Sequence, residues 1–117
     1  MAQIIDEAGV LTFSLSRLES LGACHRSLQA KKENLVGVSR VENPWSPSLL
    51  RGVRAPGTGI PFIIMLGTMR YRGGKDFCAI YKKNPVYILE FKNEEFKRWI
   101  INANSSIPTT ISEKARA

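Results

Sequence analysis

The chain has 117 residues, enough for one domain with its own core, and its 44% hydrophobic and 23% charged residues exclude wholesale disorder. Lysine and arginine outnumber the acids 17 to 10, which gives a formal charge of +7 and indicates an anionic contact or a solubilising surface. We therefore treat residues 1–117 as a single domain, with a core at about residues 10–116.

The first part of the chain has the period-two pattern of half-buried strands. Apolar and polar residues alternate over residues 10–18 and, with one slip, over residues 34–42, and both segments predict strands. The second pattern places Val36 on the apolar side. Between them, residues 19–34 fit either a short strand around residues 27–30 or a helical turn.

A segment rich in glycine and proline follows. The sequence RAPGTGIP predicts the entry to a long strand over residues 59–72. Gly67 in the middle of that strand predicts a bulge or bend. Gly73 and Gly74 predict a turn, because glycine adopts positive φ without strain.

The next segments continue the β pattern. Strands are predicted over residues 77–83 and 86–92, so residues 68–92 have the form of a three-stranded meander joined by tight turns. Residues 96–103 fit a helical stripe or a strand face. We favour the strand, which would continue the meander.

The C-terminal segment predicts a short helix. Ser105 or Ser106 can cap it, Pro108 suits its first turn, and Ile111 and Ala115 are four residues apart. Six to seven short strands closed by one helix predict a mainly β protein, built as a small curved sheet or barrel capped at one end.

Three features place the protein in the cytoplasm. The N-terminal segment carries Asp6 and Glu7 where a signal peptide would be positively charged. The longest apolar run, residues 60–67, is far shorter than the roughly 20 residues that a membrane span needs. Two cysteines do not make a disulfide framework, so we expect both thiols to be reduced.

Catalytic and cofactor signatures are weak. Neither glycine-rich loop has the spacing of a phosphate-binding loop followed by a helix. Cys24, His25 and Cys78 are too few for a structural zinc site, and a Cys–His nucleophile would lack an orienting acid. Cys78 is expected in the core, and Glu94 and Glu95 in a solvated turn. We expect no catalytic residue, no metal and no cofactor.

The basic residues are the candidate anion-binding or ligand-binding site. Arg70 and Arg72 share a face of their strand, and forked guanidinium donors suit phosphate or carboxylate. The alternative is a solvated outer face. Tyr71 lies between them on the opposite face, so it gives no stacking platform and nucleic acid is not an expected partner. The candidates are Arg51, Arg54, Arg70, Arg72 and Lys75.

The segments RGVRAPGTGIP, GTMRYRGGKDFCAIYKKNPVYILEF and NANSSIPTTI resemble those of bacterial pleckstrin-homology-like (PH-like) domain proteins. The segment LTFSLSRLESLG is similar to the first strand of an uncharacterised subgroup that contains RAPGTGIP. The resemblance runs from about Val10 to the end of the chain. It implies a PH-like curved antiparallel barrel or sandwich of about seven strands, capped by a C-terminal α-helix.

The resemblance also bears on ligands. Eukaryotic members of this fold bind phosphoinositides through basic residues in the loop after the first strand. The matching region here lacks their usual Lys-x(n)-Arg motif. Its basic residues are Arg17, His25, Arg26, Lys31 and Lys32.

Three functions follow as hypotheses. The first is a non-enzymatic PH-like binding or scaffold domain that engages a protein or peptide, with edge strands that can add a partner strand or form a homo-oligomer. The second is weak binding of an anionic membrane surface or phosphate through the basic face, which would be salt-sensitive. The third, a small hydrolase, would need Cys24, His25 and an acid in one pocket.

Overall fold

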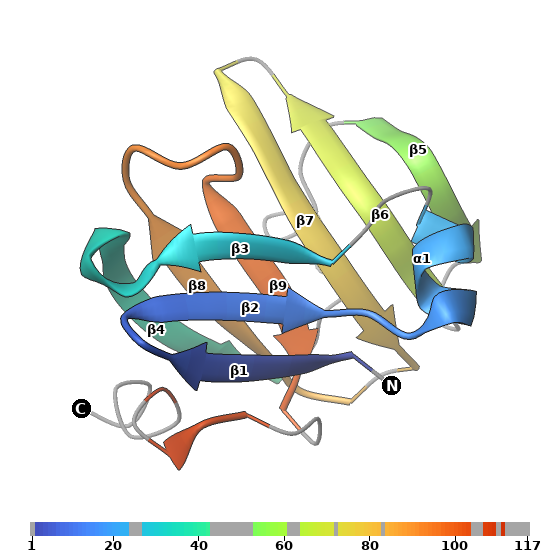
Figure 1. Cartoon of the computed structure of the whole chain (residues 1–117). Helices are drawn as coiled ribbons and strands as arrows, with labels where there is room; N and C mark the ends of the chain where they lie inside the picture. The colour runs from blue at the N-terminus through green and yellow to red at the C-terminus, as the bar shows by residue number, and fades with distance from the viewer. Residues whose placement is uncertain are drawn as a thin grey trace.

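Two β-sheets make up most of the described part of the chain in this computed structural model (Figure 1). One sheet has three strands and the other has six, so the protein is mainly β, as the alternating sequence pattern predicts. The structure describes residues 2–23, 27–42, 53–60, 64–71, 73–82, 84–103, 107–109 and 111.

The three-stranded sheet is antiparallel, with the order β1-β2-β3. Its strands are β1 (Gln3–Glu7), β2 (Val10–Ser14) and β3 (Leu28–Lys31). Ala8 and Gly9 join β1 to β2 with φ angles of 50° and 76°, as in the tight turns that suit hairpins. Strand β2 confirms the first part of the strand predicted over residues 10–18, whose last two residues instead begin helix α1 (Arg17–Ala23). Both alternatives for residues 19–34 occur, since α1 extends to Ala23 and β3 is the short strand. Strand β1 was not predicted.

The six-stranded sheet has the order β4-β8-β9-β7-β6-β5. Its strands are β4 (Leu35–Val41), β5 (Val53–Ile60), β6 (Ile64–Tyr71), β7 (Gly74–Tyr81), β8 (Val86–Phe91) and β9 (Arg98–Asn102). Tyr71 pairs with Gly74 across the β6–β7 hairpin, and Gly73 has a φ of 105°, which confirms the predicted turn.

Strand β9 corrects the predicted meander. It lies between β7 and β8, antiparallel to β8 and parallel to β7, so β7 and β8 are not neighbours. The buried amide of Asn102 helps to hold this arrangement: its Oδ1 accepts from the Tyr81 N–H at 2.7 Å, and its Nδ2 donates to the Tyr81 carbonyl at 3.3 Å. The Ala103 N–H donates to the Pro85 carbonyl at 2.8 Å. These bonds join the end of β9 to the β7–β8 connection.

The segment rich in glycine and proline forms a strand of its own, whereas the sequence predicted only the entry to a long strand. Strand β5 pairs with β6 and forms one edge of the sheet. The pairing register shifts around Pro56, and a missing N–H is tolerated in an irregular stretch of an edge strand. The single long strand predicted over residues 59–72 is wrong, since β5 ends at Ile60 and β6 begins at Ile64.

Gly67, where a bulge or bend was predicted, has a positive φ of 133°. Its pairing with Cys78 of β7 is regular, however, and the irregularity lies in the facing strand β5. Cys78 is fully buried, as predicted, and its thiol donates to the Gly67 carbonyl at 3.5 Å.

Strand β4 forms the other edge of the six-stranded sheet, and a register shift lies between Leu35 and Gly37. The shift turns Val36 to solvent, where its exposed fraction is 57%, so its predicted apolar placement is wrong. Leu35 is buried instead. An extra residue in a strand reverses the face of the sheet to which the preceding side chains point.

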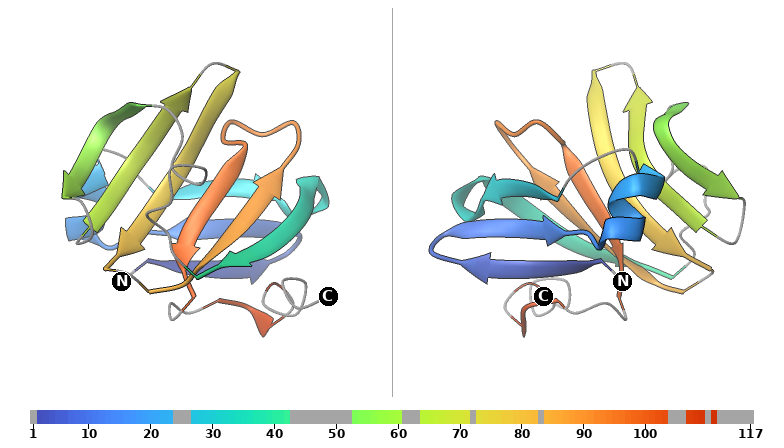
Figure 2. Two further views of the ribbon diagram at one scale, coloured as in Figure 1. Left: turned by 180° about the vertical axis from the view of Figure 1, so that it is seen from behind. Right: turned by 45° about the vertical axis from the view of Figure 1, so that its right-hand side comes forward.

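The main core lies between the two sheets. Figure 1 and Figure 2 show β1, β2 and β3 running across one face of the larger sheet. Phe13 of β2 is fully buried and meets Phe77 of β7 and Trp99 of β9 edge-on, with ring centroids 5.2 and 5.6 Å apart. A smaller cluster, with Ile80 and Ile88, lies on the opposite face of the larger sheet.

Helix α1 (Arg17–Ala23) begins with a capping box. The Glu19 N–H donates to Ser16 Oγ at 3.2 Å, and the Ser16 N–H donates to Glu19 Oε1 at 3.0 Å. Glu19 Oε2 also accepts from the Ala2 N–H at 2.7 Å and from the Tyr81 hydroxyl. The buried Glu19 carboxylate therefore joins the start of the chain, α1 and β7.

Of the two expected forms, barrel or sandwich, the described residues form a sandwich without a closed barrel, because no ladder joins the two sheets there. The predicted C-terminal helix falls mainly outside the described residues, including Ser105, Ser106 and Ala115. Ile111 is fully buried in the main core, and its N–H donates to the Pro108 carbonyl at 3.0 Å.

Candidate functional site

The structure brings two of the five predicted anion-binding residues together. Arg70 of β6 and Lys75 of β7 pair directly across the hairpin, and Arg70 is exposed. The backbone of Arg54 lies in β5 opposite Met69, and its side chain is not described. Arg51 and Arg72 lie outside the described residues.

The charge of Lys75 is already balanced. Its Nζ lies 3.5 Å from Glu95 Oε2 and 4.8 Å from the centre of the Phe96 ring. Glu95 is therefore an ion-pair partner, beyond the solvated turn predicted for it. Such a surface ion pair contributes little energy, so the role of these basic residues in anion binding stays a prediction.

A buried ion pair lies close by in the same sheet. Asp76 is fully buried and accepts from Arg98 Nε at 2.9 Å and Arg98 Nη2 at 2.6 Å. The Tyr71 hydroxyl donates to the other oxygen of Asp76 at 2.9 Å. The Tyr71 hydroxyl is thus part of this hydrogen-bond network. We assign this ion pair a structural role, because the Asp76 carboxylate and the Arg98 guanidinium are buried and already bonded to each other.

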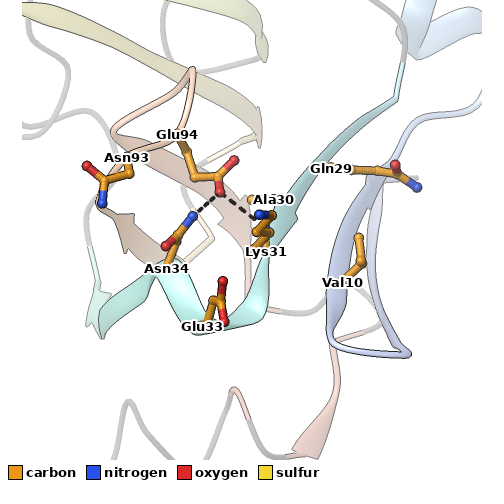
Figure 3. Close-up of a pocket in the computed structure, with 8 residues that line it drawn as sticks. All are labelled: Val10, Gln29, Ala30, Lys31, Glu33, Asn34, Asn93 and Glu94. Atoms are coloured by element: carbon orange, nitrogen blue, oxygen red, sulfur yellow. Dashed lines mark hydrogen bonds between the residues drawn. The ribbon is translucent and has the colours of Figure 1, made fainter.

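A pocket of about 540 Å³ lies where the chain passes from one sheet to the other. Strand β3 leads into the short 3-10 helix η1 (Lys32–Asn34), which leads into β4 (Figure 1). The loop between β8 and β9 closes the opposite side (Figure 3). The lining residues are Val10, Gln29, Ala30, Lys31, Glu33, Asn34, Asn93 and Glu94.

Glu94 ties the walls of this pocket together. Its Oε2 accepts from the backbone N–H of Lys31 at 3.3 Å and from the side-chain amide of Asn34 (Figure 3). The Lys92 N–H donates to the Asn34 carbonyl at 2.9 Å. Asn93 has a φ of 55°, a left-handed conformation that asparagine tolerates. Glu94 lies in a turn, as predicted, but its carboxylate is bonded to the protein and not only to solvent.

The outer edge of β3 faces the pocket. The Lys32 N–H donates to the Gly9 carbonyl at 2.9 Å, toward β2, whereas the Lys31 N–H points to Glu94. Because backbone groups alternate in an antiparallel ladder, the N–H and C=O of Gln29 and the C=O of Lys31 also point away from β2. No strand pairs with this edge among the described residues.

The outer edge of β3 could not be predicted from the sequence. Strand β3 fell in the ambiguous residues 19–34, and Glu94 comes from a loop more than sixty residues later. The only signal was Asn34 and Asn93, since asparagine is enriched where the backbone turns. That signal marks the turns and not the pocket between them.

The described residues offer no cluster of three or more His, Cys, Asp or Glu side chains that could hold a metal ion. Cys24 and His25, the residues of the hydrolase hypothesis, lie outside the described part. Within the described ranges, no helix is long and apolar enough to cross a membrane. Comparisons with protein-family models, curated proteins and solved structures found no match.

Proposed function

We propose that this protein is a non-catalytic binding module of the cytoplasm, PH-like in organisation, that engages an extended segment of a protein partner. The observation that carries the proposal is the outer edge of β3, whose backbone groups face a pocket. The mainly β architecture of two sheets is compatible with a PH-like module.

Strand addition uses the groups that this edge offers. A partner strand would accept from the Gln29 N–H and donate to the carbonyls of Gln29 and Lys31. The exposed side chain of Lys31 lines the pocket and would contact the partner's side chains. The Gln29 side chain is turned toward β2, where its Nε2 donates to Thr12 Oγ1 at 3.4 Å (Figure 3). Backbone bonds would supply affinity, and the Lys31 side chain selectivity.

The test is selection of short linear peptides from a random phage-displayed library. We expect peptides that bind the natural chain and lose at least tenfold in affinity with Gln29→Pro, which removes the outward N–H, whereas Gln29→Ala keeps it. Circular dichroism would check that both variants are folded. Selected peptides that bind Gln29→Pro equally well would overturn strand addition at β3.

Co-sedimentation with neutral and anionic vesicles at low and moderate salt tests the second hypothesis. If the protein is the module proposed here, we expect it to sediment with neither kind of vesicle. Salt-sensitive binding to anionic vesicles alone would instead favour an anionic surface as ligand for Arg51, Arg54, Arg70, Arg72 and Lys75, with the net charge of +7 as its basis.

A further inference from the structure

Two hydrogen-bond donors in the pocket meet at a single carboxylate oxygen. The Lys31 backbone N–H belongs to the outer edge of β3, and the Asn34 side-chain amide stands at the end of η1. Both donate to Glu94 Oε2, and Figure 3 shows the carboxylate lying between them. The two donors therefore form a small receptor for a carboxylate, and a residue of the same chain fills it.

Among the residues that line the pocket, Lys31 can attract an anion, whereas Glu33 and Glu94 carry the opposite charge. The side chain of Lys31 is exposed, and its ammonium forms no ion pair with any residue that the structure describes. The neighbouring Lys32 is neutralised by Asp6, with Nζ 2.6 Å from Oδ2. Glu33 also lines the pocket and opposes an anion, but it bonds to neither donor. Lys31 is thus the cation available to a carboxylate that arrives at this edge.

Glu94 can leave the receptor without unfolding the sheet. It lies in the loop after β8 and is half-buried, and its contact with the Lys31 N–H, at 3.3 Å, is long for a hydrogen bond. Rotation of its side chain would free an N–H on the edge where a partner strand would pair. The loop backbone would stay anchored to Asn34 through Lys92.

We infer that the Lys31 N–H and the Asn34 amide bind a carboxylate of the partner segment, and that Glu94 occupies this position until the partner displaces it. The inference rests on the proposed strand addition at β3. It defines the partner as an extended segment that carries an Asp or Glu side chain opposite Lys31, and it makes Glu94 an internal competitor.

The test uses two synthetic peptides of alternating Thr and Val with blocked ends, identical except for a central Glu or Gln. Each is titrated into the ¹⁵N-labelled chain while the Lys31 backbone amide and the Asn34 side-chain amide are followed by NMR. We expect the Glu peptide to shift both signals and to bind more tightly than the Gln peptide. Glu94→Ala should tighten the Glu peptide by roughly tenfold, because the internal competitor is gone.

Glu33→Ala is the matched control, since it removes the same charge from the same pocket without touching either donor. Equal tightening by Glu33→Ala and Glu94→Ala would overturn the receptor and leave only general charge repulsion. Equal binding of both peptides would overturn the carboxylate inference and leave strand addition standing. If neither peptide binds the natural chain or Glu94→Ala, strand addition fails as well. Glu94→Gln is a second variant that keeps an acceptor oxygen and so preserves the loop structure. It should tighten binding of the Glu peptide by less than Glu94→Ala does.

Discussion

At the scale of single residues, Glu19 shows how one buried carboxylate can join separate parts of the chain. Burial alone would raise its pKa, but hydrogen bonds from the Tyr81 hydroxyl and from Ser16 outweigh burial and lower the pKa below the ordinary value of 4.5. The pKa of Tyr81 is raised, first by its own burial and then by the nearby Glu19 carboxylate. The charged form of Glu19 is therefore the form that the fold stabilises.

This pKa predicts an acid-sensitive contribution to stability. Because the pKa of Glu19 is lower in the folded state, its stabilisation is present above pH 4.5 and is lost as the pH falls through the folded-state pKa. Glu19→Gln should lower the free energy of unfolding at neutral pH by about 1–3 kcal/mol, and the difference should shrink in acid. Urea denaturation across the acid range measures it. A difference that is the same at every pH would contradict the assignment.

At the scale of elements, the placement of β9 depends on a buried polar group. Asn102 is fully buried and satisfies both backbone groups of Tyr81, where β7 ends beside β9. Apolar residues at this position could fill the space but could not bond to Tyr81. The hydrogen bonds of Asn102 thus help to hold the end of β9 beside the end of β7.

Asn102→Leu tests this role. The change keeps a similar volume and leaves the N–H and C=O of Tyr81 without partners, at a cost of about 1–3 kcal/mol for each group. We expect a lower free energy of unfolding and faster hydrogen exchange at the Tyr81 amide than at the Ile80 amide. Unchanged exchange at Tyr81 would mean that water or another group replaces the asparagine.

At the scale of the whole molecule, the sequence predicts elements better than their neighbours in space. Alternation located β2, β4, β7 and β8, because each has one buried face or a long apolar run between turns. It missed β1, whose five residues have no regular alternation of buried and exposed positions. Pro56 and the glycines around it hid β5, since an edge strand tolerates residues that a central strand does not.

Pairing between distant segments was the harder problem. The meander was predicted on the assumption that consecutive strands pair with each other. This is true of β6 and β7 but not of β7 and β8. The candidate pocket was missed for the same reason, since it needs Glu94 beside Lys31. The local sequence pattern does not show that the Glu94 carboxylate, in a loop of the larger sheet, will bond to Lys31 of the smaller sheet. Of the predicted cations, Arg70 and Lys75 face each other across the β6–β7 hairpin, where consecutive strands do pair as the sequence predicts.

The two sheets are joined by packing and by single hydrogen bonds, with no shared ladder in the described residues, so the core between them should control how the smaller sheet opens. Phe13 is the central contact, edge-on to Phe77 and Trp99. Phe13→Ala should cost about 3–5 kcal/mol and should speed hydrogen exchange in β1, β2 and β3 more than in β7 and β9.

The matched control is Ile88→Ala, in the cluster on the opposite face of the larger sheet, which makes no part of the core between the sheets. It should also destabilise the protein, by about 2–5 kcal/mol, but without a selective increase of exchange in the smaller sheet. If both variants raise exchange uniformly, the molecule opens only as one cooperative unit. A selective opening of β1, β2 and β3 would place the outer edge of β3 on the less stable part of the fold, where a partner strand could repay the difference by binding.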